Sequence, residues 1–325
     1  MILAGDIGAT KTLLAIYNSS TMQPLVQYSY SSTAYAHFDE LLQTFLHKVN
    51  KPHIAAMCLG VAGPVLAGSC QTLNLPWTLH VNKLQQQTHC MRVQLLNDLE
   101  AMGHGIQHLS PTDYDCLTPE LPAQQGNIAL LAAGTGLGEA FLYWDGSQHH
   151  VIATEGGHTD FAPQTELEIE LLRFLQRQYQ HVSYERLLSG VGLFQIYQFL
   201  CEYDKQAEEP EITRQLQTVP DPSALISQFA MTRHSVLCTR ALDIFMQIYG
   251  AEAGNMALKV LSYGGVYLGG GIAPKILTAL QTSYFLQAFR AKGRYQVINA
   301  KIPVYVILNQ QIGLLGAAWY AKTHL

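Results

Sequence analysis

Each half of this 325-residue chain contains the same short device, in which a hydrophobic strand runs into a turn of small residues and a second strand follows. The first turn is Asp6-Ile7-Gly8-Ala9-Thr10, with Lys11 after it, and the second is Gly134-Thr135-Gly136. Such turns expose consecutive backbone N–H groups, and glycine lets an anion approach them without a Cβ in the way. Two such turns facing across a cleft would hold a polyphosphate from both sides, although either turn alone is also typical of a plain hairpin.

The pattern around these turns predicts an α/β protein with mixed sheets. Apolar runs predict strands at residues 2–7, 11–17, 25–30, 54–61, 92–96, 128–133, 139–144, 266–269 and 304–308. Helical spacing predicts one helix near residues 38–46 and mainly helices between residues 166 and 261. The stretch from Ser110 to Asn127 contains three prolines and no periodicity, so it is the best candidate for a domain linker. Because a single core seldom grows beyond about 250–300 residues, we expect two domains.

Composition excludes several other classes of protein. A hydrophobic content of 48% is ample for a core, and a net charge of -5 argues against a duplex nucleic-acid binder. The six cysteines form no CxxC pair, so we expect reduced thiols in a cytoplasmic protein. The first residues lack the basic and long apolar regions of a signal peptide, and no apolar run is long enough to span a membrane.

Polar residues at predicted strand ends are candidates for a functional site. Asp6 ends an apolar strand, where its carboxylate could hold Mg²⁺ through water beside phosphates or could simply cap the turn. Asn97 and Asp98 follow another buried strand, at the edge where open α/β sheets place their ligands. Asp98 could equally be the N-cap of the next helix.

Two glycine-rich segments in the second half are further candidates. Glu155 and His158 flank a double glycine and could bind a polyhydroxylated ligand, or could belong to an ordinary polar surface loop. No cysteine cluster lies nearby, which argues against structural zinc. Glu185 is poorly informative by itself. The triple glycine 269–271 precedes Pro274, and its bare backbone suits an adenine or a simple strand-to-helix loop.

The order of these motifs resembles the bacterial-type glucokinases of the hexokinase and actin-like ATPase superfamily. The matching segments are GDIGATKT at 5–12, CLGVAGPV at 58–65, LLNDLEA at 95–101, AAGTGLGEA at 132–140, EGGHTDFAP at 155–163, ERLLSG at 185–190, GGVYLGGGIAP at 264–274 and PVYVILNQQIGLLGAA at 303–318. They span nearly the whole chain, and no cysteine-rich zinc signature is present, which favours the zinc-free branch.

The resemblance implies a two-domain actin-like ATPase (ribonuclease H-like) α/β fold, with mixed sheets flanked by helices and a cleft between the domains. It implies a small domain at residues 1–109, completed by a C-terminal helix at about 312–325, and a large domain at residues 110–311.

The resemblance also implies roles for individual residues. Asp98 would be the catalytic base, and Asp6 would hold Mg²⁺, through water. The residues that would bind glucose are Asn74, Asn97, Asp98, Glu155, His158 and Glu185. The residues that would bind ATP are Asp6, Gly8, Ala9, Thr10, Lys11, Gly134, Thr135, Gly136, Gly269, Gly270 and Gly271. Ala9 stands where the family usually has glycine, and Lys11 where many members have asparagine.

The activity implied is transfer of the γ-phosphate of ATP to the 6-hydroxyl of glucose, with closure of the two domains, in a homodimer. The alternatives are a kinase of another hexose, such as mannose or N-acetylglucosamine, and a non-catalytic sugar sensor on the same fold. A sensor that represses transcription would carry an N-terminal helix-turn-helix, whereas this sequence begins directly with the first strand.

Overall fold

The structure is a computed structural model that describes residues 1–72, 75–204, 210–281 and 283–325. Asn74 therefore lies outside the described residues. The chain forms two compact units, of which the first contains Met1–Asp113 and Asn309–Leu325 and the second contains Tyr114–Leu308. The first unit is thus assembled from both ends of the sequence, and the second is one continuous stretch.

The first unit is built on a mixed five-stranded sheet with the strand order β3-β2-β1-β4-β8. Its strands are β1 (Ile2–Ile7), β2 (Lys11–Tyr17), β3 (Pro24–Ser31), β4 (Ala56–Val61) and β8 (Val93–Asn97). β1 pairs antiparallel with β2 and parallel with β4, and β4 pairs parallel with β8. The strands predicted from apolar runs are therefore confirmed. The carboxyl ends of β1, β4 and β8 meet at one edge of the sheet.

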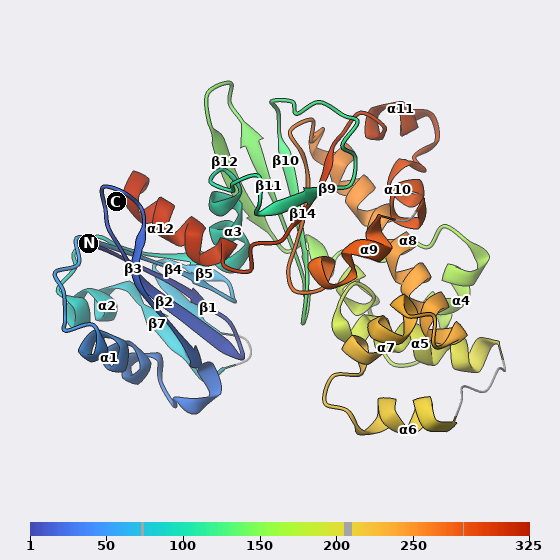
Figure 1. The fold of residues 1–325 in the computed structure, drawn as a ribbon, viewed down its shortest axis with the longest axis horizontal. Coiled ribbons are helices and arrows are strands. Elements are labelled where there is room, and N and C mark those ends of the chain that lie inside the picture. Colours follow the sequence, from blue (N-terminus) through green and yellow to red (C-terminus); the bar gives the residue numbers. More distant parts are fainter. Residues whose placement is uncertain (73–74, 205–209, 282) are drawn as a thin grey trace. The chain divides into compact units, whose positions relative to one another are not determined.

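Helices cover both faces of this sheet, as Figure 1 shows for the blue strands. The helices of this unit are α1 (Phe38–Lys48), α2 (Val81–Thr88), α3 (Asp98–Ile106), α12 (Ile312–His324) and the 3₁₀ turn η1 (Ser32–Ala34). Side chains alternate across β1, so that Leu3 packs in the cluster with α1 and α2, and Ala4 in the cluster with α3 and α12. A small sheet is formed by β5 (Val65–Leu66), β6 (Ser69–Gln71) and β7 (Thr78–His80).

Close packing of α3 against α12 depends on glycine. A Cβ on Gly316 of α12 would overlap the backbone oxygen of Ala101, and a Cβ on Gly105 of α3 would overlap that of Ile312. The two helices therefore touch backbone to backbone, which fixes where α12 begins relative to the sheet edge.

The second unit contains a mixed six-stranded sheet with the order β12-β11-β10-β13-β14-β9. Its strands are β9 (Tyr114–Cys116), β10 (Ile128–Ala133), β11 (Leu137–Trp144), β12 (His149–Thr154), β13 (Gly265–Gly269) and β14 (Val304–Ile307). The sequence patterns missed β9 and β12. β9 pairs with β14 and lies inside the segment 110–127, which was expected to be an irregular linker.

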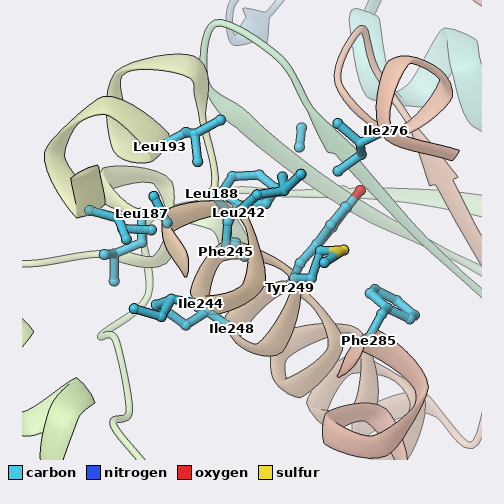
Figure 2. Packing of buried hydrophobic residues seen from close by; sticks show 14 of the residues in the cluster. Leu187, Leu188, Leu193, Leu242, Ile244, Phe245, Ile248, Tyr249, Ile276 and Phe285 are labelled. Carbon is cyan, nitrogen blue, oxygen red and sulfur yellow. The ribbon is translucent and has the colours of Figure 1, made fainter. Parts of the chain in front are cut away.

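Helices supply most of the second core. They are α4 (Glu166–Gln176), α5 (Gly190–Tyr203), α6 (Pro210–Thr218), α7 (Pro222–Met231), α8 (Val236–Val260), α9 (Leu277–Leu280), α10 (Ser283–Arg290) and α11 (Gln296–Asn299), with the 3₁₀ turns η2 (Gly156–His158), η3 (Tyr184–Arg186), η4 (Ala273–Ile276) and η5 (Gly293–Tyr295). Buried side chains of α8 such as Phe245 and Tyr249 lie at the centre of the cluster in Figure 2. Phe285 of α10 contacts the Tyr249 ring edge-on, at 5.6 Å between centroids.

None of the helices among the described residues is both long and apolar enough to cross a lipid bilayer. The six cysteines, all of which are described, form no disulfide bond with one another.

Candidate functional site

Asp6 and Asp98 lie at the carboxyl edge of the first sheet. Asp6 of β1 is opposite Gly60 of β4, and Gly60 is opposite Leu96 of β8, directly before Asn97 and Asp98. An ideal Cβ on Gly60 would come within 4.0 Å of the Asp98 Cα, so the missing side chain lets α3 start close to β4. The parallel pairing of three strands thus gathers carboxylates that are far apart in sequence.

Asn97 and Asp98 both serve the start of α3. Asn97 is the N-cap, and its Oδ1 accepts a hydrogen bond of 2.9 Å from the Leu99 N–H. Asp98 is the first helical residue, and its Oδ1 accepts from the same N–H at 3.0 Å. The alternative reading of Asp98 as the N-cap is therefore wrong by one residue. The Asn97 Nδ2 donates to the Gly63 carbonyl at 3.2 Å, which holds the amide in place.

Asp6 is half-buried at the sheet edge. Burial, together with the negative charge of Asp98, raises its pKa to about 6, and the Lys11 ammonium opposes this rise. An ideal Cβ on Gly313, in the first turn of α12, would lie 3.2 Å from the Asp6 Cγ. The carboxylate therefore faces the amino-terminal end of a helix, where negative charge is favoured. Glycine at position 313, which sequence reasoning did not single out, makes that approach possible.

The first glycine turn is held by buried hydroxyl groups. The Gly8 N–H donates to the Lys11 carbonyl at 3.0 Å. The Ser32 Oγ donates to the Gly8 carbonyl at 2.8 Å and lies 2.9 Å from the Thr12 Oγ1, and the Ser32 N–H donates to the Thr10 carbonyl at 3.0 Å. Ser32 and Thr12 are both fully buried. No sequence signal pointed to Ser32, because it reaches the turn from 24 residues away.

The second glycine turn is held by a carboxylate. The Leu137 N–H, directly after the turn, donates to the Glu185 Oε2 at 3.0 Å. A Cβ on Gly136 would overlap that oxygen, so glycine is required where Glu185 approaches. The Gly190 N–H donates to the Gly134 carbonyl at 2.9 Å. Glu185, uninformative in the sequence, is therefore tied directly to this turn.

The loop with Glu155 and His158 lies beside Glu185. The Nδ1 of His158 is 3.9 Å from the Glu185 Oε1, and the His158 side chain is 57% exposed. The His158 N–H donates to the Glu155 carbonyl at 3.0 Å, within η2. A Cβ on Gly157 would overlap the Leu137 carbonyl, so the loop lies directly on β11. The second unit thus brings the predicted sugar-binding loop and a predicted phosphate turn to one place.

The glycines after β13 complete this part of the site. Gly270 has a φ of +79°, and the Ile272 N–H donates to the Ala133 carbonyl at 3.1 Å. An ideal Cβ on Gly134 would lie 3.8 Å from the Gly271 nitrogen, so the two glycine segments are neighbours. A cavity of about 570 Å³ opens beside them, lined by Gly134, Thr135 and Gly271 and by residues of α5, α7 and η4. Sequence reasoning missed the contribution of α5 and α7.

The described site residues form one group in each unit. In the first unit the group contains Asp6, Gly8, Ala9, Thr10, Lys11, Asn97 and Asp98. In the second unit it contains Gly134, Thr135, Gly136, Glu155, His158, Glu185, Gly269, Gly270 and Gly271.

Comparison with known proteins identifies the family. The glucokinase family model matches residues 3–324. A curated relative named glucokinase, from Nostoc punctiforme, is 41% identical, and the alignment covers 98% of each chain. The crystal structure of a glucokinase from an Antarctic psychrotroph superposes with a TM-score of 0.83 at 28% identity, covering 98% of each chain. A Streptomyces griseus ROK family glucokinase, solved with glucose and AMPPNP, shares the fold at 18% identity, a TM-score of 0.66 and 99% coverage of each chain.

Two mixed α/β units, each with a glycine turn after a buried strand, define the actin-like fold of the sugar kinases. Within that class the chain belongs to the glucokinase family of ATP-dependent hexose kinases.

Proposed function

We propose that this chain transfers the γ-phosphate of ATP to the 6-hydroxyl of glucose, giving glucose 6-phosphate and ADP. The observation that carries the proposal is the position of Glu185. Its carboxylate bonds the Leu137 N–H at the end of a glycine turn and also faces His158, so one side chain links a phosphate site to a sugar site.

In this proposal the second unit contributes to the binding of both substrates. The backbone N–H groups around Gly134–Gly136 and the glycines 269–271 receive the phosphates and the adenosine, beside the cavity of about 570 Å³. Glu155 and Glu185 accept hydrogen bonds from sugar hydroxyls, and His158 can donate or accept. Asn74, which the resemblance also assigns to glucose, lies outside the described residues.

The first unit supplies the base. Asp98 accepts the proton of the 6-hydroxyl, and Asn97 orients the same sugar. A carboxylate is too weak a base to ionise a free alcohol, so the proton moves late, as the new P–O bond forms. The Leu99 N–H bonds to both Asn97 and Asp98 and holds the two side chains in a fixed orientation.

The donor set also suits Mg²⁺. Asp6 and Asp98 place two carboxylates near one another with Lys11 as the nearby cation, so a further cation is favourable there. Asp6 would hold Mg²⁺ through water, since Mg²⁺ keeps most of its hydration shell. When bound, the ion neutralises charge on the transferring phosphate.

Transfer to sugar rather than to water requires exclusion of solvent. We therefore include closure of the two units around glucose in the proposal. Small-angle scattering should give a smaller radius of gyration with saturating glucose than without it, and an unchanged radius would count against closure.

The direct test is an initial-rate assay with ATP, Mg²⁺ and a panel of sugars. Glucose should give the highest kcat/KM, with ADP released only when sugar is present. A higher kcat/KM for mannose or N-acetylglucosamine would assign the site to another hexose, and ATP turnover without sugar would contradict a kinase. Size-exclusion chromatography with light scattering tests the homodimer in the same preparation.

A further inference from the structure

A buried acidic side chain lies beneath the proposed sugar loop. Glu139 is on β11, where it pairs with Thr154 of β12, and its side chain is 1% exposed. Neither carboxyl oxygen has a hydrogen-bond partner among the described residues. An unpaired buried charge is far more costly than an unpaired neutral group, so this side chain needs a proton.

The Glu139 carboxyl touches the loop that carries Glu155 and His158. A Cβ on Gly156 would overlap the Glu139 Oε2 and would lie 3.1 Å from its Cδ. The Thr154 Oγ1 donates to the Glu139 carbonyl at 2.8 Å and accepts from the Gly156 N–H at 3.1 Å. The start of the loop is therefore supported by both the backbone and the side chain of Glu139.

A second buried acid keeps Glu139 neutral. Glu252 of α8 is fully buried, but it is well supplied with donors. The Asn255 Nδ2 donates to its Oε2 at 2.9 Å, the Lys259 Nζ lies 3.4 Å from its Oε1, and the Tyr184 hydroxyl also bonds to it. Glu252 therefore carries the negative charge of the pair, and Glu139 the proton.

Within the described part of the chain, the charged groups that shift the ionisation of Glu139 lie on α8. The charge of Glu252 disfavours ionisation of Glu139, and the charge of Lys259 favours it. An ionised Glu139 would in turn raise the pKa of the buried Tyr249. Tyr184 of η3 and Lys292 lie further out, around Glu252. Burial, and then the charge of Glu252, raises the pKa of Glu139 from 4.5 to about 8, so the carboxyl is neutral at pH 7.

We propose that Glu139 is a positioning residue: its neutral carboxyl supports the loop 155–158 in the glucose-binding conformation, and its ionisation releases that loop. Two buried negative charges, on Glu139 and Glu252, then repel each other, and the loop at Gly156, which lies directly against the Glu139 carboxyl, moves away. The inference rests on the proposed function, because it acts through Glu155 and His158.

The sign of the pH dependence follows from the direction of the shift. Glu139 is neutral in the folded protein and ionised in the unfolded chain between about pH 4.5 and pH 8, so its contribution to stability declines over that range. Above pH 8 the folded protein also loses the proton, and glucose binding weakens. If only the neutral form binds glucose, the KM for glucose at pH 9 should be about tenfold its value at pH 7.

The decisive experiment measures the KM for glucose and the calorimetric Kd for glucose from pH 6.5 to pH 9.5. The Glu139→Gln variant keeps the shape of the neutral acid but cannot ionise, so its KM should change less than about twofold over that range. Glu211→Gln, which changes an exposed glutamate of α6, should retain the wild-type profile.

A second variant covers the case in which Glu139→Gln does not fold. Glu252→Gln removes the charge that disfavours ionisation of Glu139 and leaves Lys259 in place, so the rise in KM should begin at a lower pH than in the wild type. A merely structural role for either acid would not move this inflection.

The outcomes separate the two proposals. No glucose turnover by the wild type at any pH would overturn the proposed function. Turnover with a KM that is independent of pH, or the same alkaline rise in Glu139→Gln, would overturn the role of Glu139 alone.

Discussion

The two glycine turns look alike in sequence but are supported in different ways. The turn at Gly8 is held by Ser32 and Thr12, two neutral hydroxyls that are fully buried. The turn at Gly134–Gly136 is held by Glu185, an ion whose side chain is 29% exposed and also faces His158. A buried support can act only on its own turn, whereas an exposed charged support can also touch a ligand. We therefore expect a substitution at Ser32 to change the KM of one substrate, and a substitution at Glu185 to change the KM of both.

The largest expected effect comes from Asp98 in the first unit. Asp98→Asn keeps an oxygen that can accept from the Leu99 N–H, so α3 should still form, but it removes the base. We expect kcat to fall by about 10²–10⁴-fold with little change in the KM for glucose. Steady-state kinetics measures both.

The matched control is Asp39→Asn, which changes an aspartate of α1 paired with Lys83 on the surface. It should retain wild-type kcat. Near wild-type turnover by Asp98→Asn would show that another group accepts the proton.

Substitution of Glu185 in the second unit should weaken the binding of both glucose and ATP. Glu185→Gln weakens the bond to the Leu137 N–H and removes the charge that faces His158. A hydrogen bond to a charged group is worth about 1.5–3 kcal/mol, so we expect the KM for glucose and the KM for ATP each to rise about tenfold or more.

The control for Glu185 is Glu170→Gln, on the surface of α4, where Glu170 pairs with Arg173. A rise in only one of the two KM values would break the proposed link between the phosphate turn and the sugar loop.

Substitution of Ser32, the buried support of the first turn, should affect the KM of only one substrate. Ser32→Ala leaves the Gly8 carbonyl and the Thr12 hydroxyl without that partner, which should lower the free energy of unfolding by about 1–3 kcal/mol. The KM for ATP should rise roughly three- to tenfold, and the KM for glucose should not change.

Thermal melts and kinetics of Ser31→Ala provide the comparison, since Ser31 is exposed and its hydroxyl lies 3.1 Å from the Thr33 Oγ1 rather than against the turn. An equal rise in the KM for glucose in Ser32→Ala would mean that the two supports do not differ in the way we infer.

The two units also differ in how far the sequence predicted them. The strands of the first sheet were predicted because each is an apolar run bounded by turn residues. β9 has only three residues in a proline-containing segment, and it becomes a strand through pairing with β14, nearly two hundred residues later. Such pairing is a tertiary effect, and no local pattern reports it.

The residues of the site also fall into two groups: those that local sequence patterns reveal and those that only long-range contacts reveal. Glycine turns and strand ends are local features, so Asp6, Asn97 and Asp98 could be located from sequence alone. Glu185 could be found only through the family resemblance, because its contact with Leu137 spans 48 residues. Glu139 appears in the sequence as one polar residue in a strand, and only the fold places it against Gly156 and Glu252.

The smallest expected effect tests Ala9, a residue of the first turn at which the family resemblance predicts glycine. Ala9 has no positive φ, so a Cβ is tolerated there without strain. Ala9→Gly should lower the free energy of unfolding by about 0.4–1 kcal/mol, because glycine gives the unfolded chain more freedom. It should also lower the KM for ATP, by less than about threefold, because a phosphate can then approach the backbone more closely. A KM for ATP that stays at the wild-type value would place the phosphate away from residue 9, and would leave the second turn as the main anion site.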